Sequence, residues 1–279
     1  MEQDVESTEP ARRHVDDAVV RAANRADWDE HADDYQSEHG AFLGDADLVW
    51  GPEGLREEDA RLLGDAASLA GRRFLELGAG AAQCSRWLTR QGAWAVALEL
   101  SGRQLQHARR IDDDSGTPVP LLQATATALP VADGTFDVVF ASYGAFQFVA
   151  DAGAVLAESA RVLRRPGRLV FSVTHPVRWC FPDDPGPEGL VASSSYWDTR
   201  PYVEVDPDAD DPSADAAVRY VEHHRTLGEW VRLLHAHGFR LTDLVEPEWP
   251  ADAEHAWAGW SPTRGRILPG TAIFVADLG

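Results

Sequence analysis

A carboxylate stands just before a glycine-rich turn in the first half of this chain. Glu76 lies within a short, mostly apolar run over residues 74–77, and Gly78 and Gly80 follow it. An apolar strand, a glycine turn and then a helix are the arrangement that holds a nucleotide-type cofactor. A dinucleotide fingerprint would place a third glycine at position 83, where this chain has Gln83. A pyrophosphate also disfavours a neighbouring carboxylate, so Glu76 favours a cofactor with a cationic end group.

A second carboxylate, Glu99, ends the next apolar run, about twenty residues further along. An acid at the end of the second strand of such folds accepts hydrogen bonds from ribose hydroxyls. The alternative is a solvated residue at the end of a strand. Because Leu98 and Leu100 flank Glu99, we favour the ribose-binding role.

The elements that must position these carboxylates alternate between strand and helix. Ser101, three residues before Gln104, is typical of a capping box that opens a helix. Apolar runs predict strands over residues 73–77, 95–100, 120–124, 136–141, 168–173, 239–245 and 271–276, and helical spacing predicts helices over 82–91, 151–163 and 227–237. The alternation predicts an α/β fold: a Rossmann-like, doubly wound, mostly parallel seven-stranded sheet.

Ligands of such a sheet bind outside the carboxyl ends of its strands. Five predicted loops meet at that edge and surround one crevice: residues 78–80, 99–101, 125–129, 142–148 and 174–175.

The predicted chain divides into four segments. Residues 1–70 form an N-terminal arm and helical cap, of which about the first 25 residues are polar and loose. Residues 71–175 form the cofactor-binding core. Residues 176–222, rich in Pro, Asp and Ser, form an insertion after the fifth strand that lies over the crevice as a partly mobile lid. Residues 223–279 complete the sheet.

Four stretches between residues 72 and 173 carry a family resemblance. They are ELGAGAA (76–82), ALELS (97–101), ALPVADGTFDVVF (128–140) and RVLRRPGRLVFSV (161–173). In this order and spacing they resemble the class I S-adenosylmethionine-dependent methyltransferases, of the small-molecule, type 11-like kind found in actinobacteria. The resemblance implies methyl transfer to a small organic acceptor, with S-adenosylmethionine as the cofactor.

The resemblance also assigns expected roles at the cofactor. Gly78 and Gly80 let the backbone approach the cofactor. Glu76 faces the amino group of the cofactor, and Glu99 accepts hydrogen bonds from its ribose hydroxyls. An N-terminal segment carrying Tyr35 folds over it. The remaining expected contacts are Ala79, Leu100, Gln104, Thr125, Ala126 and Thr127.

Two positions depart from the family pattern. Ala82 stands where glycine is usual, and we expect it to be a helical residue that leaves the turn functional. Thr125 stands where the family often has Asp. Its hydroxyl can still accept a hydrogen bond, but without charge.

Methyl transfer is an in-line displacement, in which alignment of the reactants supplies about 7–11 kcal/mol. A base helps when the attacking group is a hydroxyl or a protonated amine. His175 is our first candidate for that base, with a turn residue before Pro176 as the alternative. His224 is the second candidate. Tyr143 would bind or orient the acceptor, with packing as an equal alternative.

Charge and composition narrow the partners. The net charge is −21, with 46 acidic residues against 25 basic ones, which disfavours nucleic acid and anionic membranes. No apolar run approaches the ~20 residues that span a bilayer, and two distant cysteines indicate the reducing cytoplasm. No His/Cys cluster has metal-ligand spacing. Six tryptophans follow the core and either pack the insertion or wall an aromatic pocket: Trp179, Trp197, Trp230, Trp249, Trp257 and Trp260.

Two other functions remain open from the residues alone. One is a nicotinamide-dependent oxidoreductase, against which Glu76 and Gln83 argue. The other is a non-catalytic member of the methyltransferase fold that binds the cofactor as a regulatory module, which the changes at Ala82 and Thr125 would permit.

Overall fold

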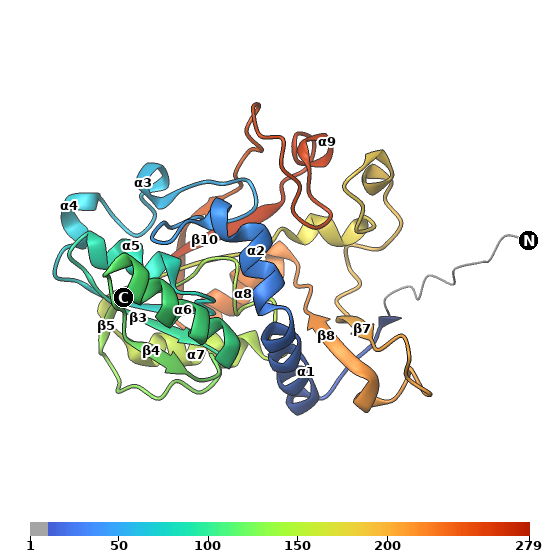
Figure 1. Ribbon diagram of the computed structural model, residues 1–279, viewed down its shortest axis with the longest axis horizontal. Coiled ribbons are helices and arrows are strands. Elements are labelled where there is room, and N and C mark those ends of the chain that lie inside the picture. The colour runs from blue at the N-terminus through green and yellow to red at the C-terminus, as the bar shows by residue number, and fades with distance from the viewer. Residues whose placement is uncertain (1–10) are drawn as a thin grey trace, which may run out of the picture.

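The computed structural model describes residues 11–279 as a seven-stranded sheet between helices, with a smaller sheet beside it (Figure 1). The strand order is β4–β3–β2–β5–β6–β10–β9. Neighbours pair in parallel, except that β10 runs antiparallel to both β6 and β9. The strands are β2 (Arg73–Leu77), β3 (Trp94–Glu99), β4 (Leu121–Gln123), β5 (Phe136–Ala141), β6 (Leu163–Thr174), β9 (Phe239–Val245) and β10 (Thr271–Leu278). The predicted fold class is confirmed.

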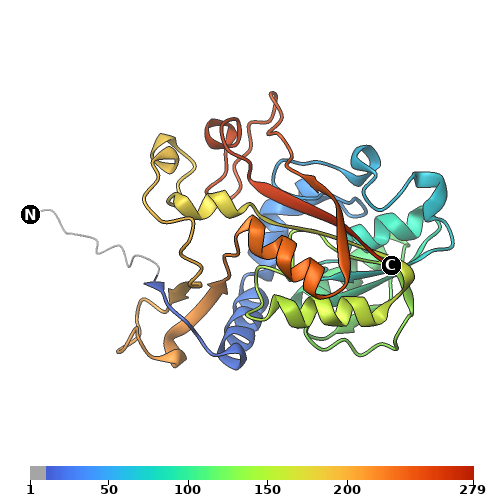
Figure 2. The ribbon, with the colours of Figure 1, turned by 180° about the vertical axis from the view of Figure 1, so that it is seen from behind.

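Alternate residues of the central strands face opposite sides of this sheet. Leu75 and Val139 join one apolar cluster, and Phe74 and Val138 join another, because successive side chains of a strand point to opposite faces. Helices α7 (Ala152–Val162) and α8 (Leu227–Ala236) cover the first face, and both lie in front of the sheet in Figure 2. The other face is covered by α5 (Gln83–Arg90), α6 (Gly102–Ser115), α3 (Glu57–Ala60) and α4 (Ala66–Leu69).

The N-terminal part is more ordered than its composition predicts. From Ala11 onward it forms strand β1 (Ala11–Arg12) and helix α1 (Asp17–Glu30), followed by α2 (Ala32–Leu43). The predicted loose arm is therefore wrong for residues 11–25, and residues 1–10 lie outside the described part. The physical reason is burial: Val20 and Ala23 of α1 pack on strand β8, while the polar faces of the helix stay in solvent.

The insertion after β6 builds the smaller sheet with that N-terminal strand. Its order is β1–β7–β8, antiparallel throughout, with β7 at Tyr202–Val205 and β8 at Val218–Glu222. Helix α1 stands between the two sheets in Figure 1. The remaining short helices are η1 (Pro176–Cys180), η2 (Pro187–Leu190), η3 (Asp215–Ala217) and α9 (Pro262–Gly265). Within residues 11–279, no helix combines the length and apolar character needed to cross a bilayer.

Candidate active site

A cleft opens at the carboxyl ends of β2, β3 and β5, beneath α1 and α2. It holds about 1200 Å³ of empty space, counted out to its open mouth. Most of the residues predicted from the sequence for the site line it: Tyr35, Glu76, Gly78, Ala79, Gly80, Glu99, Leu100, Gln104, Thr125, Ala126 and Tyr143. The other predicted residues, Thr127, His175 and His224, do not.

The floor of the cleft is the glycine turn between β2 and α5. Gly78 has φ 66°, and a Cβ built on it would lie 2.7 Å from the backbone nitrogen of Ala145 and 3.2 Å from Cα of Gly144. A side chain at Gly78 would therefore collide with the loop after β5. Gly80 has φ 52° but more room, because a Cβ there would come no closer than 3.9 Å to Gln104. The left-handed backbone at both positions suits glycine.

Ala82 lies at the end of this turn, and it is not helical. Its φ of 62° places it in the left-handed region as the N-cap residue of α5, which begins at Gln83. The expectation of a helical Ala82 is wrong, because this alanine adopts the left-handed backbone that glycine favours. The buried methyl group packs against Ala97 and Ala108.

Glu99 lies at the end of β3 and is 8% exposed. Its Oε2 accepts the backbone N–H of Gly80 at 2.8 Å, and its Oε1 accepts those of Leu100 and Ser101 at 2.7 and 2.8 Å. Burial raises the pKa of this carboxyl, and the three N–H bonds act in the opposite direction. A carboxylate has about four lone-pair sites, so Glu99 keeps acceptor capacity toward the cleft.

Glu76, 2% exposed, is the second buried carboxylate of the cleft. Its Oε2 accepts the backbone N–H of Ser85 at 3.0 Å and its hydroxyl at 2.5 Å. Burial raises the pKa of Glu76 to about 7, against the lowering effect of the Ser85 bonds. A cationic group bound beside this carboxyl would favour its ionised form.

Thr125 and Ala126 lie where β4 gives way to the next loop and line the cleft. The hydroxyl of Thr125 lies 2.9 Å from that of Thr127 and accepts the backbone N–H of Thr127 at 3.3 Å. Thr127 itself does not line the cleft. In this structure it orients Thr125, and the expected direct contact of Thr127 with the cofactor stays a prediction.

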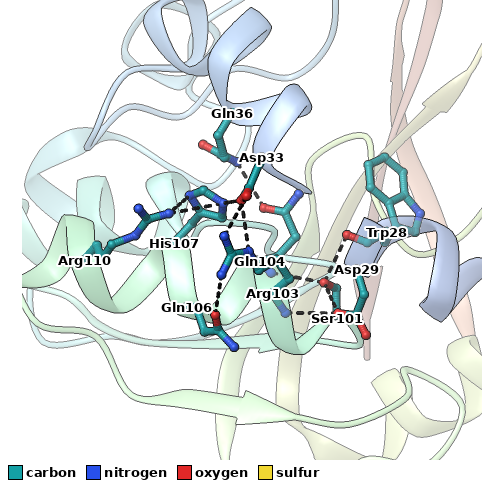
Figure 3. Close-up of polar contacts among 10 residues, drawn as sticks. All are labelled: Trp28, Asp29, Asp33, Gln36, Ser101, Arg103, Gln104, Gln106, His107 and Arg110. Atoms are coloured by element: carbon teal, nitrogen blue, oxygen red, sulfur yellow. Dashed lines mark hydrogen bonds and ion pairs between the residues drawn. The ribbon is translucent and has the colours of Figure 1, made fainter. Parts of the chain in front are cut away.

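The roof of the cleft is held down by polar contacts between α1–α2 and α6 (Figure 3). The hydroxyl of Ser101 donates to Asp29 at 2.7 Å, and Asp33 pairs with both Arg103 and His107 at 2.6 Å. Hydrogen bonds from Arg103 and His107 lower the pKa of Asp33 to about 2. Sequence reasoning missed Asp29 and Asp33, which lie about seventy residues from their partners and carry no local signal.

The predicted capping box at the start of α6 is half formed. Ser101 Oγ accepts the backbone N–H of Gln104 at 3.0 Å. The reciprocal bond is replaced, because the backbone N–H of Ser101 binds Glu99 and the side-chain oxygen of Gln104 accepts from Gln36 at 3.0 Å. Gln104 thus ties α6 to the roof helix α2 across the edge of the cleft.

Aromatic rings form the walls. Trp28 lies edge-to-face against Tyr35 and Phe148, with ring centroids 5.5 and 5.6 Å apart, and Trp257 lies 6.0 Å from Tyr35. All four line the cleft. Of the six late tryptophans only Trp257 does so. Trp197 is exposed. The other four are buried: Trp179, Trp230, Trp249 and Trp260.

The two histidines expected as bases do not line the cleft and bind other groups, and their catalytic role stays a prediction. His175 Nε2 lies 2.8 Å from Glu246, while its Nδ1 accepts the backbone N–H of Val177 and caps η1. His224 Nε2 lies 2.7 Å from the carbonyl of Tyr196. Burial lowers the pKa of both imidazoles. Each side chain therefore supports the fold of the insertion side rather than the cleft.

Comparison with known proteins identifies the part of the chain that builds this cleft. Residues 75–171 match the methyltransferase domain family. The match covers about a third of the chain and shows that this part is similar to methyltransferase domains. The glycine turn, the buried Glu76 and the acceptor capacity of Glu99 fit S-adenosylmethionine.

Relatives of the methyltransferase domain agree with this assignment. A demethylmenaquinone methyltransferase of Mycobacterium sp. (strain KMS) is 43% identical over 100 residues, which is 36% of this chain and 40% of that protein. The chain thus matches less than half the length of this curated relative. The domain match does not favour the nicotinamide-dependent oxidoreductase or the non-catalytic regulatory member.

Solved structures share the fold. An S-adenosylmethionine-dependent methyltransferase from Listeria monocytogenes aligns with a TM-score of 0.60 at 20% identity, covering 76% of this chain and 92% of its own. The 1,6-didemethyltoxoflavin-N1-methyltransferase of Burkholderia thailandensis, solved with 1,6-didemethyltoxoflavin and S-adenosylhomocysteine, aligns with a TM-score of 0.56 at 18% identity, covering 98% and 97%.

Proposed function

We propose that the protein transfers the methyl group of S-adenosylmethionine to a small, uncharged aromatic acceptor. The observation that carries the proposal is one cleft that combines a cofactor turn with aromatic walls and that has no basic side chain among the described residues lining it. The names of two similar proteins specify small-molecule acceptors, demethylmenaquinone and 1,6-didemethyltoxoflavin.

The cofactor end of the cleft is the first part of this proposal. Glu76 holds the cationic amino end of the cofactor, and Glu99 accepts its ribose hydroxyls. Leu100, Thr125 and Ala126 surround the adenine. The remaining contacts that we propose come from the turn and the roof: Gly78, Ala79, Gly80, Tyr35 and Gln104.

The charge of the cleft argues for an uncharged acceptor. Among the described residues that line it are Asp47, Glu76 and Glu99, but no Arg, Lys or His. Asp47 is already paired with Arg56, which leaves the two buried carboxylates. An anionic acceptor would meet their repulsion without a compensating basic side chain. A flat aromatic molecule suits the faces and edges of Trp28, Phe148 and Trp257.

The sulfonium of the cofactor supplies a methyl group that an acceptor can attack in line. The residues of this chain contribute position more than bond chemistry. The turn and the two carboxylates fix one reactant, and the aromatic walls orient the other and exclude water beneath α1 and α2.

We also propose the division of labour among the four segments. Residues 1–70 cap the cofactor and residues 71–175 bind it. Residues 176–222 cover the acceptor side, and residues 223–279 complete the sheet. With a net charge of −21, the protein acts in the cytoplasm on a free small molecule and not on nucleic acid.

Calorimetry followed by turnover tests this function. We expect S-adenosylmethionine and S-adenosylhomocysteine to bind and NADH not to bind. Purified protein is then incubated with S-adenosylmethionine and paired acceptors, each an uncharged phenol or N-heteroaromatic with its carboxylated analogue. We expect S-adenosylhomocysteine release with uncharged members only. If no cofactor binds at millimolar concentration, the proposed methyltransferase function is wrong. If carboxylated acceptors are turned over preferentially, the argument for an uncharged acceptor is wrong.

A further inference from the structure

Three side chains from distant parts of the chain form a line that starts at the cleft wall. Tyr143, which lines the cleft, places its hydroxyl 3.2 Å from Thr174 Oγ1. Thr174 Oγ1 lies 3.0 Å from Glu222 Oε1. Tyr143 follows β5, Thr174 ends β6 and Glu222 ends β8 of the smaller sheet. The line therefore runs from the cofactor cleft into the interface with the insertion.

The direction of the hydrogens along this line follows from the number of donors. Thr174 has a single hydroxyl hydrogen, and an ionised carboxylate can only accept. When Glu222 is ionised, Thr174 therefore donates to Glu222, and the hydroxyl of Tyr143 donates to Thr174. The tyrosine oxygen is left with acceptor capacity, on a residue that lines the cleft. The three groups are thus ordered as a path along which a proton can move away from the cleft.

Tyr143 is held in an unusual backbone conformation. Its φ of 57° lies in the left-handed region, which costs a non-glycine residue about 1–3 kcal/mol and is concentrated at functional sites. The backbone N–H of Tyr143 donates to Ser172 Oγ at 2.7 Å, and Gln147 Nε2 donates to its carbonyl at 3.3 Å. The loop that carries Tyr143 also abuts the glycine turn, where Gly144 contacts Gly78.

The surroundings of Glu222 suit a group that takes up a proton. Burial raises its pKa, while Arg178, Thr174 and Tyr220 lower it and Asp183 raises it. Tyr220 donates to the second oxygen of Glu222 at 3.1 Å. Arg178 is itself paired with Asp183 at 2.8 Å.

The hydroxyl of Tyr143 faces further charged groups. Burial is the largest effect and raises the pKa of Tyr143 far above its ordinary value. The charges of Glu222 and Glu53 raise this pKa further, and that of Arg178 lowers it. Tyr143 therefore stays protonated at neutral pH and passes protons on without ionising by itself.

We propose that Tyr143, Thr174 and Glu222 form a proton relay that accepts the hydrogen of an O–H or N–H acceptor during methyl transfer. The acceptor forms its bond to the methyl carbon as the carbon–sulfur bond breaks, and the electron pair of that bond stays on sulfur. The acceptor's proton moves to the oxygen of Tyr143, the proton of Tyr143 moves to Thr174, and that of Thr174 moves to Glu222. Glu222 ends as a carboxylic acid and later returns the proton to solvent. The relay rests on the proposed methyltransferase function.

A chromogenic phenol tests the relay without turnover. The protein is saturated with S-adenosylhomocysteine, and 4-nitrophenol is titrated in at a pH about one unit below its own pKa. The absorbance of the bound phenolate is then measured for the wild type, Glu222→Gln and Thr174→Val. The relay predicts a clear phenolate band in the wild type, because Glu222 takes the proton, and a several-fold weaker band in both variants.

The sign of this change separates a relay from a merely structural carboxylate. A fixed negative charge near the probe would suppress the phenolate, so Glu222→Gln would then strengthen the band. A stronger band, an unchanged band or no binding of 4-nitrophenol to the loaded protein overturns the proposal. Unchanged S-adenosylhomocysteine affinity and circular dichroism show that the variants fold.

Tyr220→Phe is the matched control. It removes a partner of Glu222 that lies off the line to Tyr143. Losing that donor makes Glu222 more basic, so we expect a phenolate band at least as strong as in the wild type. Failure of the proposed function would appear separately, as absence of S-adenosylmethionine binding.

Discussion

The glycine-turn region and the relay region meet at one cleft but are built differently. In the turn, Glu76 binds Ser85 nine residues away and Glu99 binds Gly80 nineteen residues away. In the relay, the steps from Tyr143 to Thr174 and from Thr174 to Glu222 span 31 and 48 residues. In the turn, carboxylate side chains accept hydrogen bonds from backbone N–H groups. In the relay, the hydrogen bonds join one side chain to another. The cofactor end is therefore set by local chain geometry and the acceptor end by tertiary packing.

Gly78→Ala should have the largest effect, because Gly78 joins the two regions. An added methyl group meets the backbone of Gly144 and Ala145, beside Tyr143. The left-handed backbone costs about 1–2 kcal/mol and the overpacking about 1–3 kcal/mol. We expect about 2–5 kcal/mol less stability by urea denaturation, with loss of both cofactor and 4-nitrophenol binding.

Gly80→Ala is the matched control for that variant. Gly80 is also left-handed, with φ 52°, but an added Cβ has only an ordinary contact at 3.9 Å. Gly80→Ala should lower the free energy of unfolding only by the cost of the left-handed backbone, about 1–2 kcal/mol. Equal destabilisation by the two variants would show that the contact between turn and loop is not what joins the regions.

Glu99→Ala should act on the turn region alone. It removes the proposed ribose acceptor and leaves three buried N–H groups without their carboxylate. We expect the affinity for S-adenosylhomocysteine, measured by calorimetry, to fall by about 1.5–3 kcal/mol. At cofactor concentrations high enough to restore saturation, the 4-nitrophenol band should be normal. An unchanged affinity would remove Glu99 from the cofactor site.

The same contrast explains what the sequence could predict. Strand β9 was predicted with both its ends correct, and Glu76, Gly78 and Glu99 were placed in the cleft because their signals lie within one strand–turn–helix unit. Glu222 carries no such signal. Its partner Thr174 is brought to it only when the insertion folds back against helix α1 and the main sheet.

The two histidines illustrate the same limit. His175 directly follows β6, as a catalytic residue of this fold would. Its position along the chain does not reveal that its ring nitrogens are already used by Val177 and Glu246. Side-chain direction at the ends of strands depends on the loops that surround them, and these loops are irregular in sequence.

Glu76→Gln sharpens the comparison through pH. The pKa of Glu76 is raised from 4.5 to about 7, so the folded protein holds a proton that the unfolded chain releases. The stability from this group is present below pH 4.5 and is lost as the pH rises through about 7, by at most about 3 kcal/mol. Glu76→Gln should abolish this part of the pH dependence in urea denaturation.

The affinity for the cofactor should change with pH in the opposite direction to the stability. A cationic amino group needs the ionised carboxylate, so S-adenosylmethionine affinity should rise with pH up to about 7 and then level off. In Glu76→Gln the affinity should be flat with pH and roughly tenfold weaker above that value, the loss of one charge-assisted bond. Calorimetry at several pH values checks this. A wild-type affinity independent of pH contradicts the pairing.

Ala82→Gly should have the smallest effect, since Ala82 itself does not line the cleft. Glycine relieves the left-handed backbone at φ 62°, a gain of about 1–2 kcal/mol. It also loses a buried methyl group packed on Ala97 and Ala108, a cost of about 0.8 kcal/mol. We expect a net gain of up to about 1 kcal/mol in urea denaturation, with cofactor affinity unchanged. A large gain in affinity would show that this alanine distorts the turn that binds the cofactor. The local chain geometry of the turn would then not be enough to set the cofactor end of the cleft.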